Sequence, residues 1–154
     1  MKVLIVEDQA QHMADALEVL GKIEGLEIFT ATNFEDAIDV LYNHRPDGII
    51  TDIFIPFKSG RHSDDPCGLN VATVALTYKI KCVFCTDQYH HGEKLAWIND
   101  MFNSLREPLN CAWGTHIIDV DPHYSDGNGG NKNWQAAHDH LFGIEKTTID
   151  VENF

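Results

Sequence analysis

Basic residues are scarce in this chain of 154 residues, and their scarcity excludes several classes of partner. Eleven lysines and arginines stand against 24 aspartates and glutamates, which gives a formal net charge of -13 at pH 7. A surface this acidic repels both the phosphate backbone of nucleic acids and anionic membrane surfaces. We therefore expect no direct binding to nucleic acid or to a membrane.

Long apolar runs are also lacking. The first apolar run, residues 3–6, is followed directly by two carboxylates, which is unlike a signal peptide or a membrane span. No other stretch approaches the roughly 18 apolar residues that a span requires. These features predict a cytoplasmic protein.

Cysteine is limited to four positions, of which Cys82 and Cys85 form a CxxC motif. A single domain of this length buries a core large enough to be stable without disulfides. The motif lies in the strand-like run IKCVFC, where an odd separation directs the two side chains to opposite faces of a sheet. We predict buried free thiols rather than redox or zinc chemistry.

Strand-like and helix-like segments alternate along the chain. Apolar, β-branched runs predict the strands, and apolar residues at helical spacing predict the helices. The expected strands are residues 3–6, 26–31, 48–55, 80–85 and 115–120, and the expected helices are residues 10–20, 34–41 with Asn33 as N-cap, 69–76, 92–105 and 134–141. The pattern predicts a doubly wound α/β domain with a five-stranded parallel sheet, helices on both faces and the flavodoxin-like strand order 2-1-3-4-5.

The same pattern predicts one domain with two unusually long loops. The domain is expected to span residues 1–142, with long loops at 57–67 and 121–133. Residues 143–154 are expected to form a C-terminal tail, with no output domain after it.

Polar side chains follow the expected strands at one edge of the sheet. Glu7 and Asp8 follow the first strand, Asp52 lies within the third, and Thr86 follows the fourth. Three carboxylates that meet at one edge repel one another unless they share a cation, and their hard oxygen atoms suit Mg²⁺. We predict a Mg²⁺ site formed by these three carboxylates and the backbone carbonyl of Phe54.

Asp52 is the best candidate for a nucleophile at this edge. It lies in an apolar strand, where a lone carboxylate is costly unless a metal or hydrogen bonds satisfy it. A carboxylate beside a metal ion can attack a phosphoryl group. The Thr86 hydroxyl could then donate a hydrogen bond to a phosphoryl oxygen and report the modification to the chain that follows.

Four motifs in this order resemble those of response-regulator receiver domains. They are the acidic pair in MKVLIVEDQ, the acceptor in GIITDIFIP, the Gly68-Leu69 pair that opens the third helix, and the hydroxyl in CVFCTDQ. The resemblance implies a stand-alone receiver that binds Mg²⁺ and accepts a phosphoryl group on Asp52 from a sensor histidine kinase or a phosphotransfer protein. It also implies no enzymatic activity beyond this transfer, and signalling or homodimerisation through the fourth helix, fifth strand and fifth helix.

The fifth strand departs from this resemblance. Receivers end that strand with a lysine followed by proline, and the lysine neutralises the acceptor and the phosphoryl group. The matching text here is THIIDVDPHY, so aligning on Pro122 places Asp121 at the lysine position and Ile118 at the position of an aromatic switch residue. The pocket is then expected to lack its usual cation.

Three basic residues in the long loops are candidates for a substitute cation. Lys58 and Arg61 belong to the first loop and Lys132 to the second, although solvated surface charges are the simpler interpretation of all three.

Two alternative functions remain open. A pseudo-receiver that binds partners without phosphorylation is favoured by the absence of the lysine. A Mg²⁺-dependent phosphohydrolase would use Asp52 on a small substrate, with the long loops as a lid.

Overall fold

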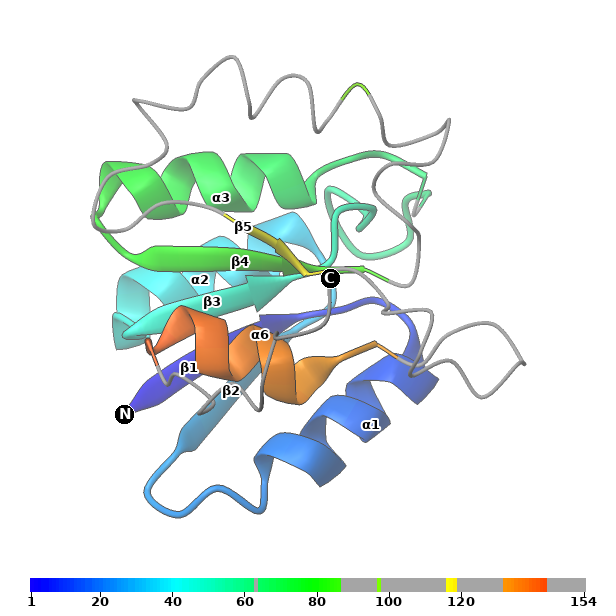
Figure 1. Cartoon of the computed structure of the whole chain (residues 1–154). Coiled ribbons are helices and arrows are strands. Elements are labelled where there is room, and N and C mark those ends of the chain that lie inside the picture. The colour runs from blue at the N-terminus through cyan, green and yellow to red at the C-terminus, as the bar shows by residue number, and fades with distance from the viewer. Residues whose placement is uncertain (63, 87–96, 98–115, 119–131, 144–154) are drawn as a thin grey trace.

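A computed structural model describes residues 1–62, 64–86, 97, 116–118 and 132–143. Its five parallel strands form one sheet in the order β2-β1-β3-β4-β5 (Figure 1), which confirms the predicted topology. The strands are β1 (Lys2–Val6), β2 (Glu27–Ala31), β3 (Gly48–Thr51), β4 (Lys81–Cys85) and β5 (His116–Ile118). The inner strands β1 and β3 are paired from Val3 and Gly48 to Val6 and Thr51.

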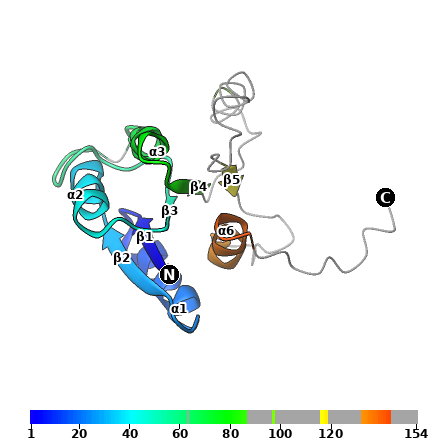
Figure 2. The ribbon, with the colours of Figure 1, turned by 90° about the vertical axis from the view of Figure 1, so that its left-hand side faces the viewer.

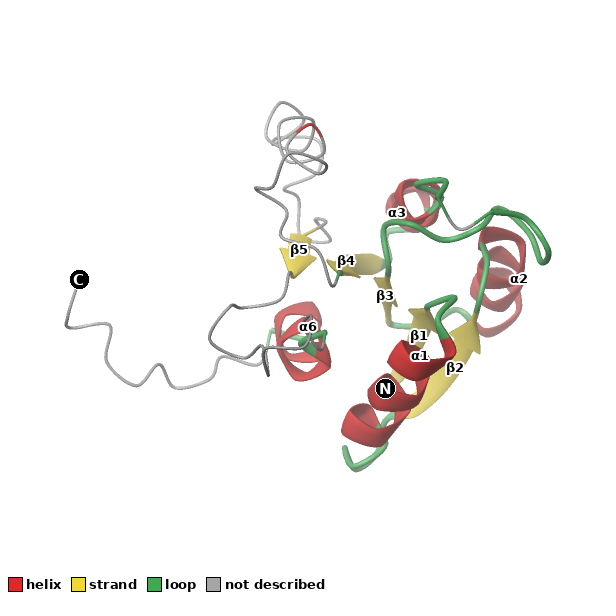
Figure 3. Ribbon diagram, turned by 90° about the vertical axis from the view of Figure 1, so that its right-hand side faces the viewer, coloured by secondary structure: helices red, strands yellow, loops and turns green. Residues whose placement is uncertain are grey.

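Helices cover both faces of this sheet, as the alternating pattern predicts. They are α1 (Ala10–Leu20), α2 (Phe34–His44), α3 (Gly68–Thr77) and α6 (Trp134–Leu141). Figures 2 and 3 show α2 and α3 on one face and α1 and α6 on the other. None of the described helices is long and apolar enough to cross a membrane. Residues 92–105, where a further helix is predicted, lie outside the described residues except for the exposed Trp97.

The core consists of two apolar clusters, one on each face of the sheet. The cluster beneath α2 and α3 contains Cys82, whereas the cluster beneath α1 and α6 contains Cys85 and Trp134. The two cysteines of the CxxC motif are therefore buried on opposite faces, as predicted. Burial raises the pKa of the Cys82 thiol, so that this group is neutral at physiological pH. Cys111 lies outside the described residues.

The buried faces of the helices agree with the sequence pattern at α6 and differ from it at α1. Helical spacing predicts one buried stripe for α6, and all four of its residues are buried, namely Trp134, Ala137, His138 and Leu141. The apolar residues at helical spacing, Ala10, Met13, Leu17 and Leu20, predict one apolar face for α1, but the buried residues are Ala16 and Leu20, and Leu17 is 42% exposed. A small alanine permits close approach of a helix to the sheet, and here it outweighs the larger apolar area of the neighbouring leucine.

Candidate functional site

Three carboxylates meet at the carboxyl-terminal edge of the sheet. Asp52 directly follows β3, and its backbone N–H donates to the carbonyl of Val6 at 2.9 Å, which places it beside the end of β1. Glu7 and Asp8 follow β1 at the same edge. One carboxylate oxygen from each of the three acidic residues lies within 4.8 Å of the others. The structure thus brings together the three residues that the sequence predicts as metal ligands.

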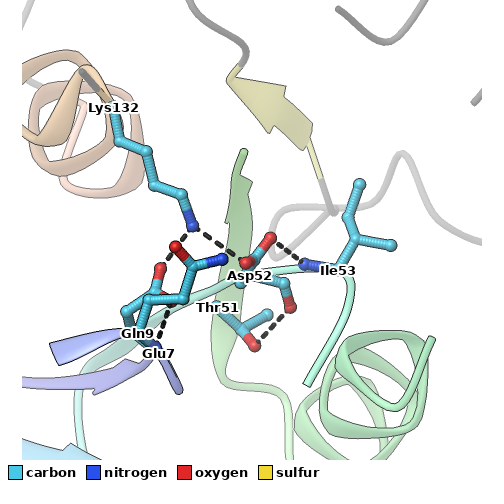
Figure 4. A network of polar contacts seen from close by, with 6 residues as sticks. All are labelled: Glu7, Gln9, Thr51, Asp52, Ile53 and Lys132. Carbon is cyan, nitrogen blue, oxygen red and sulfur yellow. Dashed lines mark hydrogen bonds and ion pairs between the residues drawn. The ribbon is translucent and has the colours of Figure 1, made fainter. Parts of the chain in front are cut away.

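A lysine side chain enters this acidic pocket from the other side. The Lys132 ammonium contacts Oε2 of Glu7 and lies 2.9 Å from Oδ2 of Asp52 (Figure 4). Only 5% of Lys132 is exposed, and its Nζ lies 5.6 Å from the centre of the Trp134 ring. A buried ammonium therefore neutralises part of the charge of the three carboxylates.

Lys132 reaches the pocket because the start of α6 is fixed beside it. The side chain of Asn133 caps the helix by accepting a hydrogen bond from the backbone N–H of Ala136 at 3.0 Å. Trp134, the first residue of α6, is 2% exposed and packs in the core cluster beneath α1 and α6. These two contacts hold the preceding residue at the edge where the parallel strands end.

The loop cations favoured by the sequence do not occupy this position. Lys58 and Arg61 are exposed, and no ion pair in the described part of the chain joins either of them to the acidic pocket. The cation in the pocket is instead Lys132, the further candidate of the second long loop. Asp121, predicted at the degenerate lysine position, lies outside the described residues.

The first long loop leaves the pocket and returns to it almost at the same place. A parallel bridge joins Ile55 to Pro66, so that the two ends of the loop lie side by side. The start of the loop also caps α2, because the carbonyls of Pro56 and Phe57 accept hydrogen bonds from the first two backbone N–H groups of that helix at 3.0 Å. Beside this loop, β3 keeps its pairing with both β1 and β4.

The charges in the pocket shift each other's protonation. Burial raises the pKa of the Glu7 carboxyl; the Lys132 ammonium opposes this shift and Asp52 adds to it. Burial by itself lowers the pKa of Lys132, but the carboxylates of Asp52 and Glu7 outweigh burial and raise it. Lys132 is therefore a charged ammonium at physiological pH.

The Asp52 carboxylate is held at both oxygens. Its Oδ1 accepts a hydrogen bond from the backbone N–H of Ile53 at 2.7 Å, and its Oδ2 faces Lys132 (Figure 4). The Thr51 hydroxyl donates to the Asp52 carbonyl at 2.9 Å, which fixes the backbone as well. With 5% of the residue exposed, the carboxylate lies just beneath the surface in one orientation.

Asp8 provides the clearest indication that the pocket fits a divalent cation. Its Oδ1 is buried and has no hydrogen-bond partner in the described part of the chain. A buried carboxylate oxygen without a donor is costly unless a cation satisfies it. Carboxylate oxygens are the hard ligands that Mg²⁺ prefers, so the donor set fits this ion.

The remaining predicted residues follow β3 and β4 at the same edge of the sheet. Thr86 is buried and directly follows β4, the neighbour of β3 in the sheet. Phe54 follows Asp52 by two positions and is half-buried against the core.

No protein-family model matches the sequence. Solved structures of similar fold include the signal receiver domain of an HD domain-containing protein from Pseudomonas fluorescens, which is 13% identical, with a TM-score of 0.60 over 92% of this chain and 94% of that chain. A putative response regulator from Chloroflexus aurantiacus is 18% identical, with a TM-score of 0.56 over 92% and 97% of the two chains. The BeF3-activated receiver domain of RstA from Klebsiella pneumoniae is 17% identical, with a TM-score of 0.53 over 80% and 90%. The chain therefore has the fold of response-regulator receiver domains.

Proposed function

We propose that this protein is a receiver that accepts a phosphoryl group on Asp52 and signals through a changed protein-binding surface. The observation that carries the proposal is the position of the Lys132 ammonium, 2.9 Å from Oδ2 of Asp52 in a pocket with two further carboxylates. An acceptor carboxylate, a metal-binding acidic pair and a fixed cation are the groups that phosphoryl transfer to a carboxylate requires.

Each residue of the pocket has a separate role in the proposed phosphoryl transfer. An oxygen of Asp52 attacks the phosphorus of a donor, a mixed anhydride bond forms, and the bond from phosphorus to the donor's leaving atom breaks. Lys132 faces Oδ2 and is placed to neutralise charge on the phosphoryl oxygens. Glu7, Asp8, Asp52 and the carbonyl of Phe54 would hold Mg²⁺, which when bound neutralises negative charge on the transferring group.

The receiver-like fold supports a proposal for the donor and for the output. We propose a sensor histidine kinase or a phosphotransfer protein as donor, and a cytoplasmic partner or a second copy of the chain as target. The proposed target surface comprises the fourth helix, β5 and α6, of which α6 is described throughout. Thr86 would couple the pocket to that surface through a hydrogen bond to a phosphoryl oxygen.

Intact-mass measurement tests the proposal directly. After incubation with a small acyl phosphate and Mg²⁺, we expect the chain to gain the mass of one phosphoryl group. The adduct should disappear in Asp52→Asn, because an amide cannot act as the acceptor, and should persist in the matched control Asp39→Asn, an exposed position on α2.

The outcomes of this measurement separate the rival functions. An adduct that persists in Asp52→Asn would place the acceptor elsewhere and overturn the proposal. Donor turnover without any adduct would indicate the phosphohydrolase. No adduct and no turnover, with intact folding, would indicate the pseudo-receiver.

The pseudo-receiver stays a second candidate on one observation, the engagement of both oxygens of a nearly buried Asp52 by Ile53 and Lys132. An incoming phosphoryl group must compete with contacts that already satisfy the carboxylate. The absence of a lysine no longer favours this candidate, because Lys132 occupies the pocket.

Substitution of the first loop's cations should leave the reaction intact. We expect Lys58→Ala and Arg61→Ala to form the adduct at the wild-type rate and to change the free energy of unfolding by no more than about 0.5 kcal/mol, because both side chains are exposed. A time course of adduct formation and a urea titration measure the two quantities. A loss of adduct in either variant would show that the loop supplies a second cation during transfer.

A further inference from the structure

We infer that the Lys132 ammonium is an internal cation that competes with the divalent ion for the acidic pocket. Lys132 contacts two of the three residues that would bind the metal, Glu7 and Asp52. The inference rests on the metal-binding half of the proposed function. It adds that metal binding requires the ammonium to withdraw from Glu7.

The oxygen atoms of the pocket show why the two cations exclude one another. Oε1 of Glu7 accepts the backbone N–H of Gln9 at 3.0 Å, and Oε2 is in contact with the ammonium. Oδ1 of Asp52 accepts the N–H of Ile53, and Oδ2 faces the same ammonium. A neutral backbone donor can share a carboxylate oxygen with a metal ion, but a second positive charge on that oxygen repels it.

Asp8 shows which part of the site the lysine leaves unsatisfied. Lys132 pairs with Glu7 and Asp52, while Oδ1 of Asp8 is buried without a donor among the described residues. One ammonium thus satisfies two of three clustered carboxylates. A divalent ion bound to all three would satisfy Asp8 as well, at the cost of the contact between Lys132 and Glu7.

The lysine can leave Glu7 without leaving the pocket. Its contact with Asp52 at 2.9 Å does not depend on Glu7, and a phosphoryl group on Asp52 would offer further oxygen acceptors. Lys132 therefore has two arrangements, one bridging Glu7 and Asp52 without metal and one on the acceptor side with metal. The position of Lys132 directly before the cap of α6 links this exchange to that helix.

Calorimetric titration of the full chain with Mg²⁺, and with Mn²⁺ as a second probe, tests the competition. We expect Lys132→Met to bind Mg²⁺ about ten- to hundredfold more tightly than the wild type, because the metal no longer has to displace a charged hydrogen bond. Lys81→Met, at an exposed lysine that begins β4 at the opposite edge of the sheet, should keep the wild-type affinity.

Salt distinguishes a direct exchange from a general effect of charge. Contacts between buried groups are screened far less than long-range interactions at the surface. The affinity ratio between Lys132→Met and the wild type should therefore persist when the NaCl concentration is raised tenfold. A ratio that falls to one at high salt would overturn the direct exchange.

A second variant covers the case in which Lys132→Met does not fold without metal. Lys132→Gln is neutral but can still donate hydrogen bonds to a carboxylate, and it should also bind Mg²⁺ more tightly than the wild type. Equal or weaker affinity in the folded variants would overturn the inference while leaving the proposed metal site standing. Failure of every variant and of the wild type to bind Mg²⁺ or Mn²⁺ would overturn both. Neither measurement requires a phosphodonor, so failed phosphorylation would leave the inference unaffected.

Discussion

Gly68→Ala is expected to lower the free energy of unfolding by about 3 kcal/mol. A Cβ atom at this position would overlap the backbone carbonyl oxygen of Asp52 and would lie 2.8 Å from that of Ile53. These are backbone atoms fixed by other contacts: the Thr51 hydroxyl donates to the Asp52 carbonyl, and the Gly68 N–H donates to the Ile53 carbonyl at 2.9 Å. Rotamer changes cannot relieve the overlap, so α3 must move away from the backbone of Asp52 and Ile53.

Gly48→Ala is the matched control for this prediction. Its Cβ would lie 2.5 Å from Cδ2 and 2.8 Å from Cγ of Leu141, which are side-chain atoms that another rotamer of Leu141 would move. We expect this substitution to lower the free energy of unfolding by only about 1 kcal/mol. Urea titration measures both variants. Equal losses would show that the close approach of α3 to Asp52 does not limit stability.

The pair Gly68-Leu69 illustrates how far the sequence specifies the fold. This pair predicts the start of the third helix, and α3 does begin at Gly68. The physical reason is that only glycine permits the helix to begin against the Asp52 backbone. The strand order, the cap at Asn33 and the opposite faces of Cys82 and Cys85 also followed from local pattern. The cap and the faces of the two cysteines depend on backbone chemistry or periodicity within a few residues, whereas the strand order follows from the alternation of strands and helices along the whole domain.

The face of α1 was less predictable, because two stripes in this helix have the same spacing. Met13 and Leu20 belong to both, and the choice between Ala16 and Leu17 depends on how closely the helix approaches the sheet. Hydrophobicity alone favours the leucine. Close packing favours the alanine, and that is a tertiary property.

The cation of the pocket was harder to predict than its carboxylates. Glu7, Asp8 and Asp52 follow strands directly, so parallel pairing fixes their position. Lys132 is 14 residues beyond the end of β5 at Ile118, a separation that matching the family's lysine and proline could not bridge. The sequence feature that could have identified Lys132 is its position directly before the Asn133 cap. In a doubly wound sheet the chain returns to the edge where the parallel strands end, so a residue just before a helix cap can lie at the pocket.

Lys132→Met is expected to lower the free energy of unfolding by about 3–5 kcal/mol at pH 7 without divalent cations, because it leaves Glu7 and Asp52 buried without their counter-ion. Glu7→Gln should lower the free energy of unfolding by less than Lys132→Met does, because Lys132 keeps its contact with Asp52. The double variant should recover part of the loss of Lys132→Met, because it also removes one of the two like charges. Urea titrations of the four proteins form a double-mutant cycle, and strictly additive losses would rule out coupling between these residues.

The difference between the wild type and Lys132→Met should be greatest near neutral pH. The pKa of Lys132 is raised above its ordinary 10.5, so its contribution is complete below that pH and is lost as pH rises through the raised value. The difference in unfolding free energy between the two proteins should therefore narrow above about pH 10.5.

On the acid side, the pKa of Glu7 is raised above 4.5 by burial, so the folded chain takes up this proton before the unfolded chain does. The Lys132 charge lowers the pKa of Glu7, so this pKa is raised further in Lys132→Met. The variant therefore gains more stability than the wild type as pH falls toward 4.5. The difference in unfolding free energy between the two proteins narrows at acid pH as well. Unfolding free energies measured between pH 5 and pH 11 test this profile, and a difference independent of pH would mean that Lys132 stabilises the fold by packing rather than by charge.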